Sequence, residues 1–269
     1  MVRHTEPELS FAVRSDVGRR REVNEDAALA AFPCFLVADG MGGHEAGDEA
    51  SAAAIAAFTE AVEPGRPATV KEALAAIDAA RHAVDLVAAS KDRGAGCTLT
   101  GAVLVQHQDE LCWLVVNVGD SRVYLHRGAE LHQITVDHSL RDELIAGGEW
   151  DESRLPGRNV ISRALGSVDS TPDTWLLPVE DGARLLICSD GLTTEVGDDQ
   201  LRAALTMGGR AEAVVDELVL RANDAGGRDN VTVLVVDVLS GGRPWHVGSG
   251  TGSATLDDST LTATVPRRA

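Results

Sequence analysis

The 269-residue chain has few aromatic residues and no long apolar run. Phe, Trp and Tyr together make up 3% of it, whereas apolar residues of all kinds make up 44%, so Ala, Val and Leu must fill most of the core. No stretch approaches the roughly 18 consecutive apolar residues of a membrane helix. The N-terminus also has no basic region followed by an apolar stretch. These absences predict a globular, cytoplasmic protein with no membrane partner.

Cysteine is scarce as well. Cys34, Cys97, Cys112 and Cys188 are far apart in the chain, and their spacing matches no zinc site. Three of them lie in apolar, strand-like runs, as small buried hydrophobic residues do. Free thiols in a reducing compartment are therefore favoured over the alternative, a disulfide framework.

Basic residues are outnumbered, with 24 Lys and Arg against 42 Asp and Glu and a formal net charge of −18. Such a chain would repel a nucleic-acid backbone or an anionic membrane surface, so we expect neither as a partner. Metal cations and positively charged protein segments are compatible with the charge. Most of the carboxylate excess is explained by its ordinary contribution to solubility.

Apolar periodicity predicts strands and helices in blocks rather than in alternation. The strand patterns cover 9–18, 34–38, 97–106, 111–118, 121–126, 130–135, 183–189 and 231–238. The helical patterns cover 46–61, 69–89, 139–146, 199–207 and 210–224. Blocks of this kind indicate an α+β fold, and short turns between strands indicate antiparallel pairing.

The expected architecture is a four-layer α-β-β-α sandwich, with two antiparallel sheets flanked by helix pairs. One domain is expected over residues 1–240. Residues 241–269 are rich in Gly, Ser and Thr with few bulky groups, so they are predicted to form a flexible tail.

Four acidic residues stand at or near the ends of strand-like runs, three of them beside glycine. They occur in Asp39-Gly40, Gly119-Asp120, Asp190-Gly191 and Gly227-Arg228-Asp229-Asn230. A single Asp-Gly pair is a common turn, but four such sites together indicate a shared purpose. Carboxylate oxygens suit hard cations such as Mg²⁺ and Mn²⁺, with waters completing the coordination.

Ordered motifs along the chain resemble those of the protein phosphatase 2C family, the metal-dependent protein phosphatases, in their bacterial form. They cover about residues 9–238. The motifs are Ser15 to Asp26, Val37 to His44, Ala95 to Thr98, Asn117 to Arg122, Asp137-His138-Ser139, Arg163 to Gly166, Cys188 to Leu192 and Asp229-Asn230. The resemblance implies hydrolysis of phosphoserine and phosphothreonine on proteins by a water activated between two metal ions.

The resemblance also assigns metal ligands. Asp39 matches the carboxylate that bridges two Mg²⁺ or Mn²⁺ ions, and Gly40 would offer its backbone carbonyl to one of them. Asp190 and Asp229 would hold the other ion. Asp120 matches a residue that helps to bind a third, weaker ion in bacterial members, the alternative being a turn aspartate.

The remaining matches concern the surroundings of the ions. Glu25 and Asp26 match the family's acidic pair, but neighbours on a strand point to opposite faces, so both cannot be equivalent direct ligands. Roles through bound water or behind the ligands are expected for them. Arg21 matches the phosphate-binding position, where a guanidinium can hold two phosphate oxygens. No covalent phosphoenzyme is implied.

The proton donor to the leaving oxygen is the least defined part of this assignment. Eukaryotic members often have His directly after the Asp-Gly pair, where this chain has Met41. His44 is the candidate. Two alternatives stay open: His44 caps a helix, or a metal-bound water donates the proton.

The loosely patterned segment 138–165 corresponds to the family's flap beside the active site, in which Trp150 would either contact a peptide or pack. The expected partners are phosphoproteins modified by a Ser/Thr protein kinase, and a monomer is expected. Two rival functions are a phosphopeptide-binding scaffold without catalysis and a two-metal hydrolase of small phosphate metabolites. Neither is favoured, because no metal-binding carboxylate is missing and no base- or sugar-binding signature is present.

Overall fold

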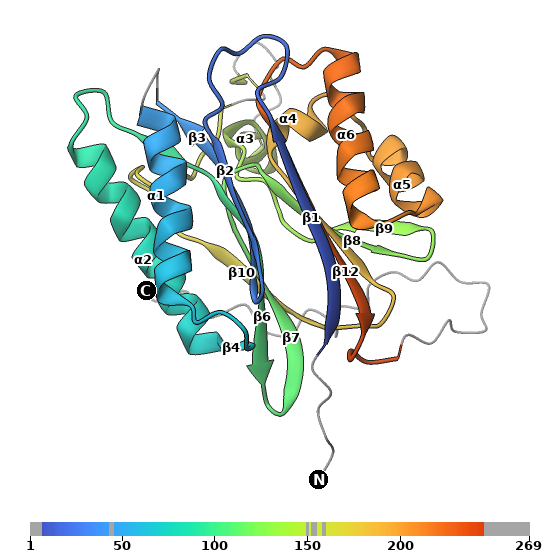
Figure 1. Cartoon of the computed structure of the whole chain (residues 1–269). Helices are drawn as coiled ribbons and strands as arrows, with labels where there is room; N and C mark the ends of the chain where they lie inside the picture. The colour runs from blue at the N-terminus through green and yellow to red at the C-terminus, as the bar shows by residue number, and fades with distance from the viewer. Residues whose placement is uncertain (1–6, 43–45, 149–150, 152–154, 158–159, 245–269) are drawn as a thin grey trace.

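The computed structural model describes residues 7–42, 46–148, 151, 155–157 and 160–244. Two β-sheets stack face to face, and helices cover the outer face of each sheet (Figure 1). This is the predicted four-layer α-β-β-α sandwich. None of the described helices is both long and apolar enough to cross a membrane.

The larger sheet has seven strands, with the central order β10-β7-β6-β3-β2, while β5 pairs with β3 and β4 pairs with β6. All of its pairings are antiparallel except the short one between β4 and β6. The strands are β2 (Asp26–Ala31), β3 (Cys34–Met41), β4 (Ala68–Thr69), β5 (Gly96–Cys97), β6 (Leu99–His107), β7 (Glu110–Val118) and β10 (Asp173–Pro178).

The smaller sheet has five antiparallel strands in the order β1-β12-β11-β8-β9. Its strands are β1 (Glu8–Asp16), β8 (Arg122–Arg127), β9 (Glu130–Gln133), β11 (Arg184–Cys188) and β12 (Val231–Ser240). Between the two sheets, Phe35 packs edge to face against Trp113 at 5.9 Å and against Phe11 at 5.0 Å, in a layer that is otherwise largely aliphatic.

The helices bury their small apolar faces against the sheets. α1 (Ala46–Ala61) and α2 (Val70–Ala89) cover the seven-stranded sheet, and α5 (Asp198–Met207) and α6 (Ala211–Ala225) cover the five-stranded one. The start of α2 is fixed by a capping box between Thr69 and Glu72. Two shorter helices are α3 (Leu140–Ala146) and α4 (Asp190–Thr193).

The predicted elements are present, with ends that differ by a few residues. One predicted boundary near the site was wrong: the strand expected over 34–38 does not end before Asp39-Gly40, because β3 continues to Met41. The short strand β5 pairs with its last two residues, Gly40 with Cys97 and Met41 with Gly96. Strands β2, β4 and β10 and the short helix α4 were not predicted.

The predicted tail at 241–269 lies mostly outside the described residues, which end at 244. Its first residues are bound to the domain, because Arg243 N donates to Val179 O at 2.8 Å and Asp181 N donates to Arg243 O at 3.0 Å. The flexible tail beyond them stays a prediction.

Candidate active site

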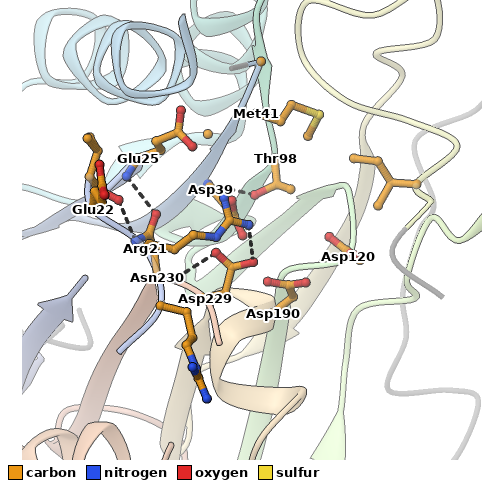
Figure 2. A pocket seen from close by; sticks show the side chains of 15 residues that line it. Arg21, Glu22, Glu25, Asp39, Met41, Thr98, Asp120, Asp190, Asp229 and Asn230 are labelled. Atoms are coloured by element: carbon orange, nitrogen blue, oxygen red, sulfur yellow. Dashed lines mark hydrogen bonds and ion pairs between the residues drawn. The ribbon is translucent and has the colours of Figure 1, made fainter. Parts of the chain in front are cut away.

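An open pocket of about 560 Å³ lies where ends of both sheets meet, and six of the fifteen residues that line it are acidic. Figure 2 shows the carboxylates of Asp39, Asp120, Asp190 and Asp229 directed toward a common space, with the Arg21 side chain reaching across it. Glu25 and Gly40 also line this pocket. Metal and phosphate residues predicted from motifs up to 208 residues apart are therefore brought together.

Asp39 is held at the floor of the pocket by Thr98. The Asp39 backbone N–H donates to Thr98 Oγ1 at 3.0 Å, and Thr98 N–H donates to the Asp39 carbonyl at 2.8 Å. Burial, and then the nearby charges of Asp26, Asp190 and Asp120, raise the pKa of Asp39 well above its usual range. The fold thus places a carboxyl group where its ionised form is costly without a compensating positive charge.

The pKa values of Asp120 and Asp190 are raised by the same two causes, burial and nearby negative charge. Asp120 lies in the turn between β7 and β8, and burial followed by the charge of Asp190 raises its pKa to about 7. Asp190 opens α4, and burial followed by the charge of Asp229 raises its pKa. Like charges that a fold holds together in this way require protons or cations between them.

Arg21 meets Asp229 at the mouth of the pocket, where Arg21 Nη2 donates to Asp229 Oδ2 at 2.8 Å. Both side chains are more than a third exposed, so this ion pair adds little to stability. The exposure leaves the other guanidinium N–H groups open to a ligand that enters from solvent.

Asn230 connects the loop that carries Arg21 to the rest of the site. Its Nδ2 donates to the carbonyls of Val17 at 3.0 Å and Val23 at 2.9 Å, and its Oδ1 accepts from Glu25 N at 2.9 Å. The motif comparison gave no role to Asn230 or to Thr98. Their presence in the motifs was the available signal, but their hydrogen-bond partners could not be read from the sequence.

Glu25 and Asp26 lie on different sides of the pocket wall, as expected for neighbours in an extended segment. Glu25 lines the pocket, whereas Asp26 lies behind it and accepts a hydrogen bond from Ser189 Oγ at 2.9 Å. Burial raises the pKa of Asp26 to about 6. Glu25 Oε1 and Asp26 Oδ1 are both buried without a hydrogen-bond partner.

Gly40 is required by close packing at the pocket wall. A Cβ atom at this position would lie 2.3 Å from the Gly47 carbonyl oxygen and 2.5 Å from the Glu25 carbonyl oxygen. Only glycine lets these three backbone segments approach one another.

The chemistry of the pocket fits hydrated divalent cations. Burial and then mutual repulsion raise the pKa values of Asp39, Asp120 and Asp190, and two buried carboxylate oxygens, Glu25 Oε1 and Asp26 Oδ1, lack hydrogen-bond partners. Among the described residues, no group of three or more His, Cys, Asp or Glu side chains is arranged to hold a metal ion by itself. Mg²⁺ does not require such a group, because it keeps several waters and is commonly bound through one or two carboxylates.

The rest of the predicted site is less complete. His44 and Trp150 lie outside the described residues, while Met41 lines the pocket. The described part of the predicted flap includes α3, and its residue Ile161 lines the pocket. His138, the first residue of the segment predicted to form the flap, is buried beside the turn that carries Asp120.

Comparison with known proteins agrees with this geometry. Residues 19–229 match the family described as Protein phosphatase 2C. The chain is 36% identical to the serine/threonine phosphatase stp of Listeria monocytogenes serovar 1/2a, over 83% of this chain and 94% of that protein. It is 37% identical to the serine/threonine protein phosphatase PstP of Mycobacterium tuberculosis, over 97% of this chain and 51% of PstP.

Solved structures are similar over the folded part. The Mycobacterium tuberculosis phosphatase PstP/Ppp superposes with a TM-score of 0.76 at 35% identity, covering 86% of this chain and 99% of that one. The catalytic domain of PstP in complex with two manganese ions gives a TM-score of 0.75 at 34% identity, covering 86% and 99%.

Proposed function

The chain belongs to the protein phosphatase 2C family and is a metal-dependent serine/threonine protein phosphatase, and we propose that the acidic pocket is its active site. The observation that carries this assignment is the convergence of Asp39, Asp190 and Asp229 on one pocket beside Arg21. Phosphoproteins are its substrates.

Asp39, Asp190, Asp229 and the Gly40 carbonyl would hold two divalent cations, Mg²⁺ or Mn²⁺, with Asp39 shared between them. Asp120 would contribute to a third, weaker site. Glu25 and Asp26 would act through bound water or behind the ligands. When bound, the cations supply a water nucleophile that is activated at neutral pH, and they neutralise charge on the phosphate oxygens.

The protein's own side chains perform the other tasks. Thr98 binds both the backbone N–H and the backbone carbonyl of Asp39, so the backbone that carries this carboxylate is fixed before substrate binds. Arg21 is anchored to Asp229 by one N–H group and would bind phosphate oxygens with the others. His44 stays the predicted proton donor to the leaving oxygen.

Arg21→Ala is expected to raise KM for a phosphothreonine peptide roughly tenfold, the effect of losing one or two hydrogen bonds between charged groups. The value of kcat should fall less, because the mutation leaves every carboxylate in place. Steady-state kinetics at saturating Mn²⁺ measure both constants, and Arg14→Ala, which removes another exposed arginine paired with an aspartate, is the matched control. An unchanged KM would show that phosphate is bound elsewhere.

The assignment is tested by phosphate release from a phosphothreonine peptide with Mn²⁺ and with EDTA, in wild type and in Asp190→Asn. Wild type should be active only with the cation, and Asp190→Asn should be nearly inactive. Full activity of Asp190→Asn would overturn the metal assignment. Inactive wild type that still binds the peptide would favour the scaffold, and activity confined to small phosphate esters would favour the metabolite hydrolase.

We also propose that the enzyme acts in the cytoplasm as a monomer and opposes a Ser/Thr protein kinase. Its four cysteines are all buried and unpaired, which suits a reducing compartment.

A further inference from the structure

His138 makes two contacts with the residue that precedes Asp120. The Gly119 backbone N–H donates to His138 Nδ1 at 3.0 Å, and the His138 backbone N–H donates to the Gly119 carbonyl at 3.0 Å. The His138 side chain is buried, with a residue exposure of 3%. The histidine that begins the flap segment is thus bonded to the turn that carries Asp120.

These contacts define the tautomer of His138. Because Nδ1 accepts a hydrogen bond from a peptide N–H, it carries no proton. The proton of the neutral ring is therefore on Nε2, which lies 3.2 Å from Asp173 Oδ2 and donates to it.

Asp173 and Arg163 lock the ring from the other side. Arg163 Nη1 lies 3.2 Å from both Asp173 Oδ1 and His138 Nε2. Since Nε2 carries the proton, the guanidinium cannot donate to it, and its hydrogen bond goes to Asp173. Asp173 therefore bridges Arg163 and His138, which belong to the two ends of the flap.

The turn needs such support because its backbone is unusual. Gly119 has φ 113°, and a Cβ atom there would lie 2.5 Å from Thr98 Cγ2. Asn117 Nδ2 also donates to the Gly119 carbonyl, at 3.0 Å. On the far side of Asp120, Ser121 Oγ is hydrogen-bonded to Thr98 Oγ1 at 2.8 Å, so both neighbours of Asp120 are tied down.

We propose that His138 is a positioning residue for the phosphatase reaction: as the Nε2–H tautomer it fixes the Gly119 peptide and thereby the Asp120 carboxylate at its place in the pocket. This inference rests on the proposed role of Asp120 in holding the weaker cation. It assigns His138 a role in cation binding through hydrogen bonding behind the ligand, the kind of contact that orients metal ligands in proteins.

Two substitutions separate this role from a general structural one. His138→Asn places an amide oxygen near the position of Nδ1 and keeps the acceptor for Gly119 N–H. His138→Gln reaches the position of Nε2 but has a methylene near the position of Nδ1, so it keeps the contact to Asp173 and loses the one to Gly119. Asp120→Asn reports whether Asp120 binds the cation at all.

Mn²⁺ binding is measured by the loss of the free-ion EPR signal, and Mn²⁺ activation of peptide dephosphorylation is measured in parallel. His138→Gln should weaken the weakest-bound Mn²⁺ about tenfold, as lost contacts behind metal ligands do, and shift the activation curve equally. Asp120→Asn should do the same, whereas His138→Asn should stay close to wild type. Equal defects in His138→Asn and His138→Gln would overturn the inference.

Two further results keep the inferences distinguishable. Unchanged Mn²⁺ binding in Asp120→Asn would overturn the proposed role of Asp120, and the His138 inference with it. A defect in Asp120→Asn but none in His138→Gln would overturn the His138 inference alone. In wild type, ¹⁵N NMR of the imidazole should show the Nε2–H tautomer, and the Nδ1–H tautomer would contradict the proposal even if a variant fails to fold.

Discussion

Asp39→Asn is expected to abolish phosphatase activity and, at the same time, to make the cation-free protein harder to unfold. Loss of one preorganised electrostatic group lowers the rate roughly 10²–10³-fold. Because Asp39 is proposed to bind both cations, we expect its loss to lie at the upper end of this range. Stability should rise because the amide removes a buried negative charge from among Asp26, Asp120 and Asp190 and can donate a hydrogen bond to one of them.

Both effects are measured on the same protein preparation. Peptide dephosphorylation at saturating Mn²⁺ gives the activity, and thermal unfolding in EDTA at pH 7 gives the stability, where each kcal/mol raises Tm by about 2–4 °C. Asp85→Asn, the same chemical change at an exposed position of α2, should alter neither. Wild-type activity in Asp39→Asn, or a lower Tm in EDTA, would contradict the account of the pocket.

Removal of divalent cations is expected to abolish activity and to make stability fall steeply as pH rises from about 4 to about 7, the interval between ordinary and raised carboxyl pKa values. The folded-state pKa values of Asp26 and Asp120 are raised to about 6 and about 7, and that of Asp39 is raised well above its usual range. In this interval the folded protein binds more protons than the unfolded chain, so the stabilisation present at low pH is lost as pH rises.

Saturating Mn²⁺ should remove this slope, because the cations replace the protons between the carboxylates. Denaturant unfolding at several pH values, with EDTA and with Mn²⁺, measures the difference, and each pKa unit corresponds to about 1.4 kcal/mol. Asp39→Asn should reduce the slope in EDTA. If stability in EDTA instead rises over this pH interval, the folded protein does not raise the pKa values of these carboxyl groups, and the account of the pocket is contradicted.

The sequence predicted the layers of the fold well because most strands and helices carry a strong apolar period. The two longer strands that were missed, β2 and β10, are the edge strands of the seven-stranded sheet. β2 consists of an aspartate, a leucine and four alanines, and β10 ends in proline. Alanine has low strand propensity and proline is confined to strand edges and ends, so neither pattern indicated a strand.

The candidate site was predicted from motifs, which identify residues along the chain but not the contacts that hold them in place. Motif positions identified the acidic residues and Arg21, which the pocket brings together. They did not reveal how these residues are held, because Thr98 and Asn230 bind groups that are 59 and 205 residues away in the chain. The strand predicted over 34–38 ended before Asp39-Gly40 because its partners there, β2 at Asp39 and the two-residue β5 at Gly40, left no recognisable strand pattern.

The most direct test of the central claim is a crystal structure grown with Mn²⁺, with diffraction data collected at a wavelength where manganese scatters anomalously. The account predicts two strong anomalous peaks in the pocket, one on each side of the Asp39 carboxylate, with Asp190 and Asp229 at one of them and the Gly40 carbonyl at the other. A pocket without anomalous density at saturating Mn²⁺, or peaks that Asp39 does not contact, would contradict it.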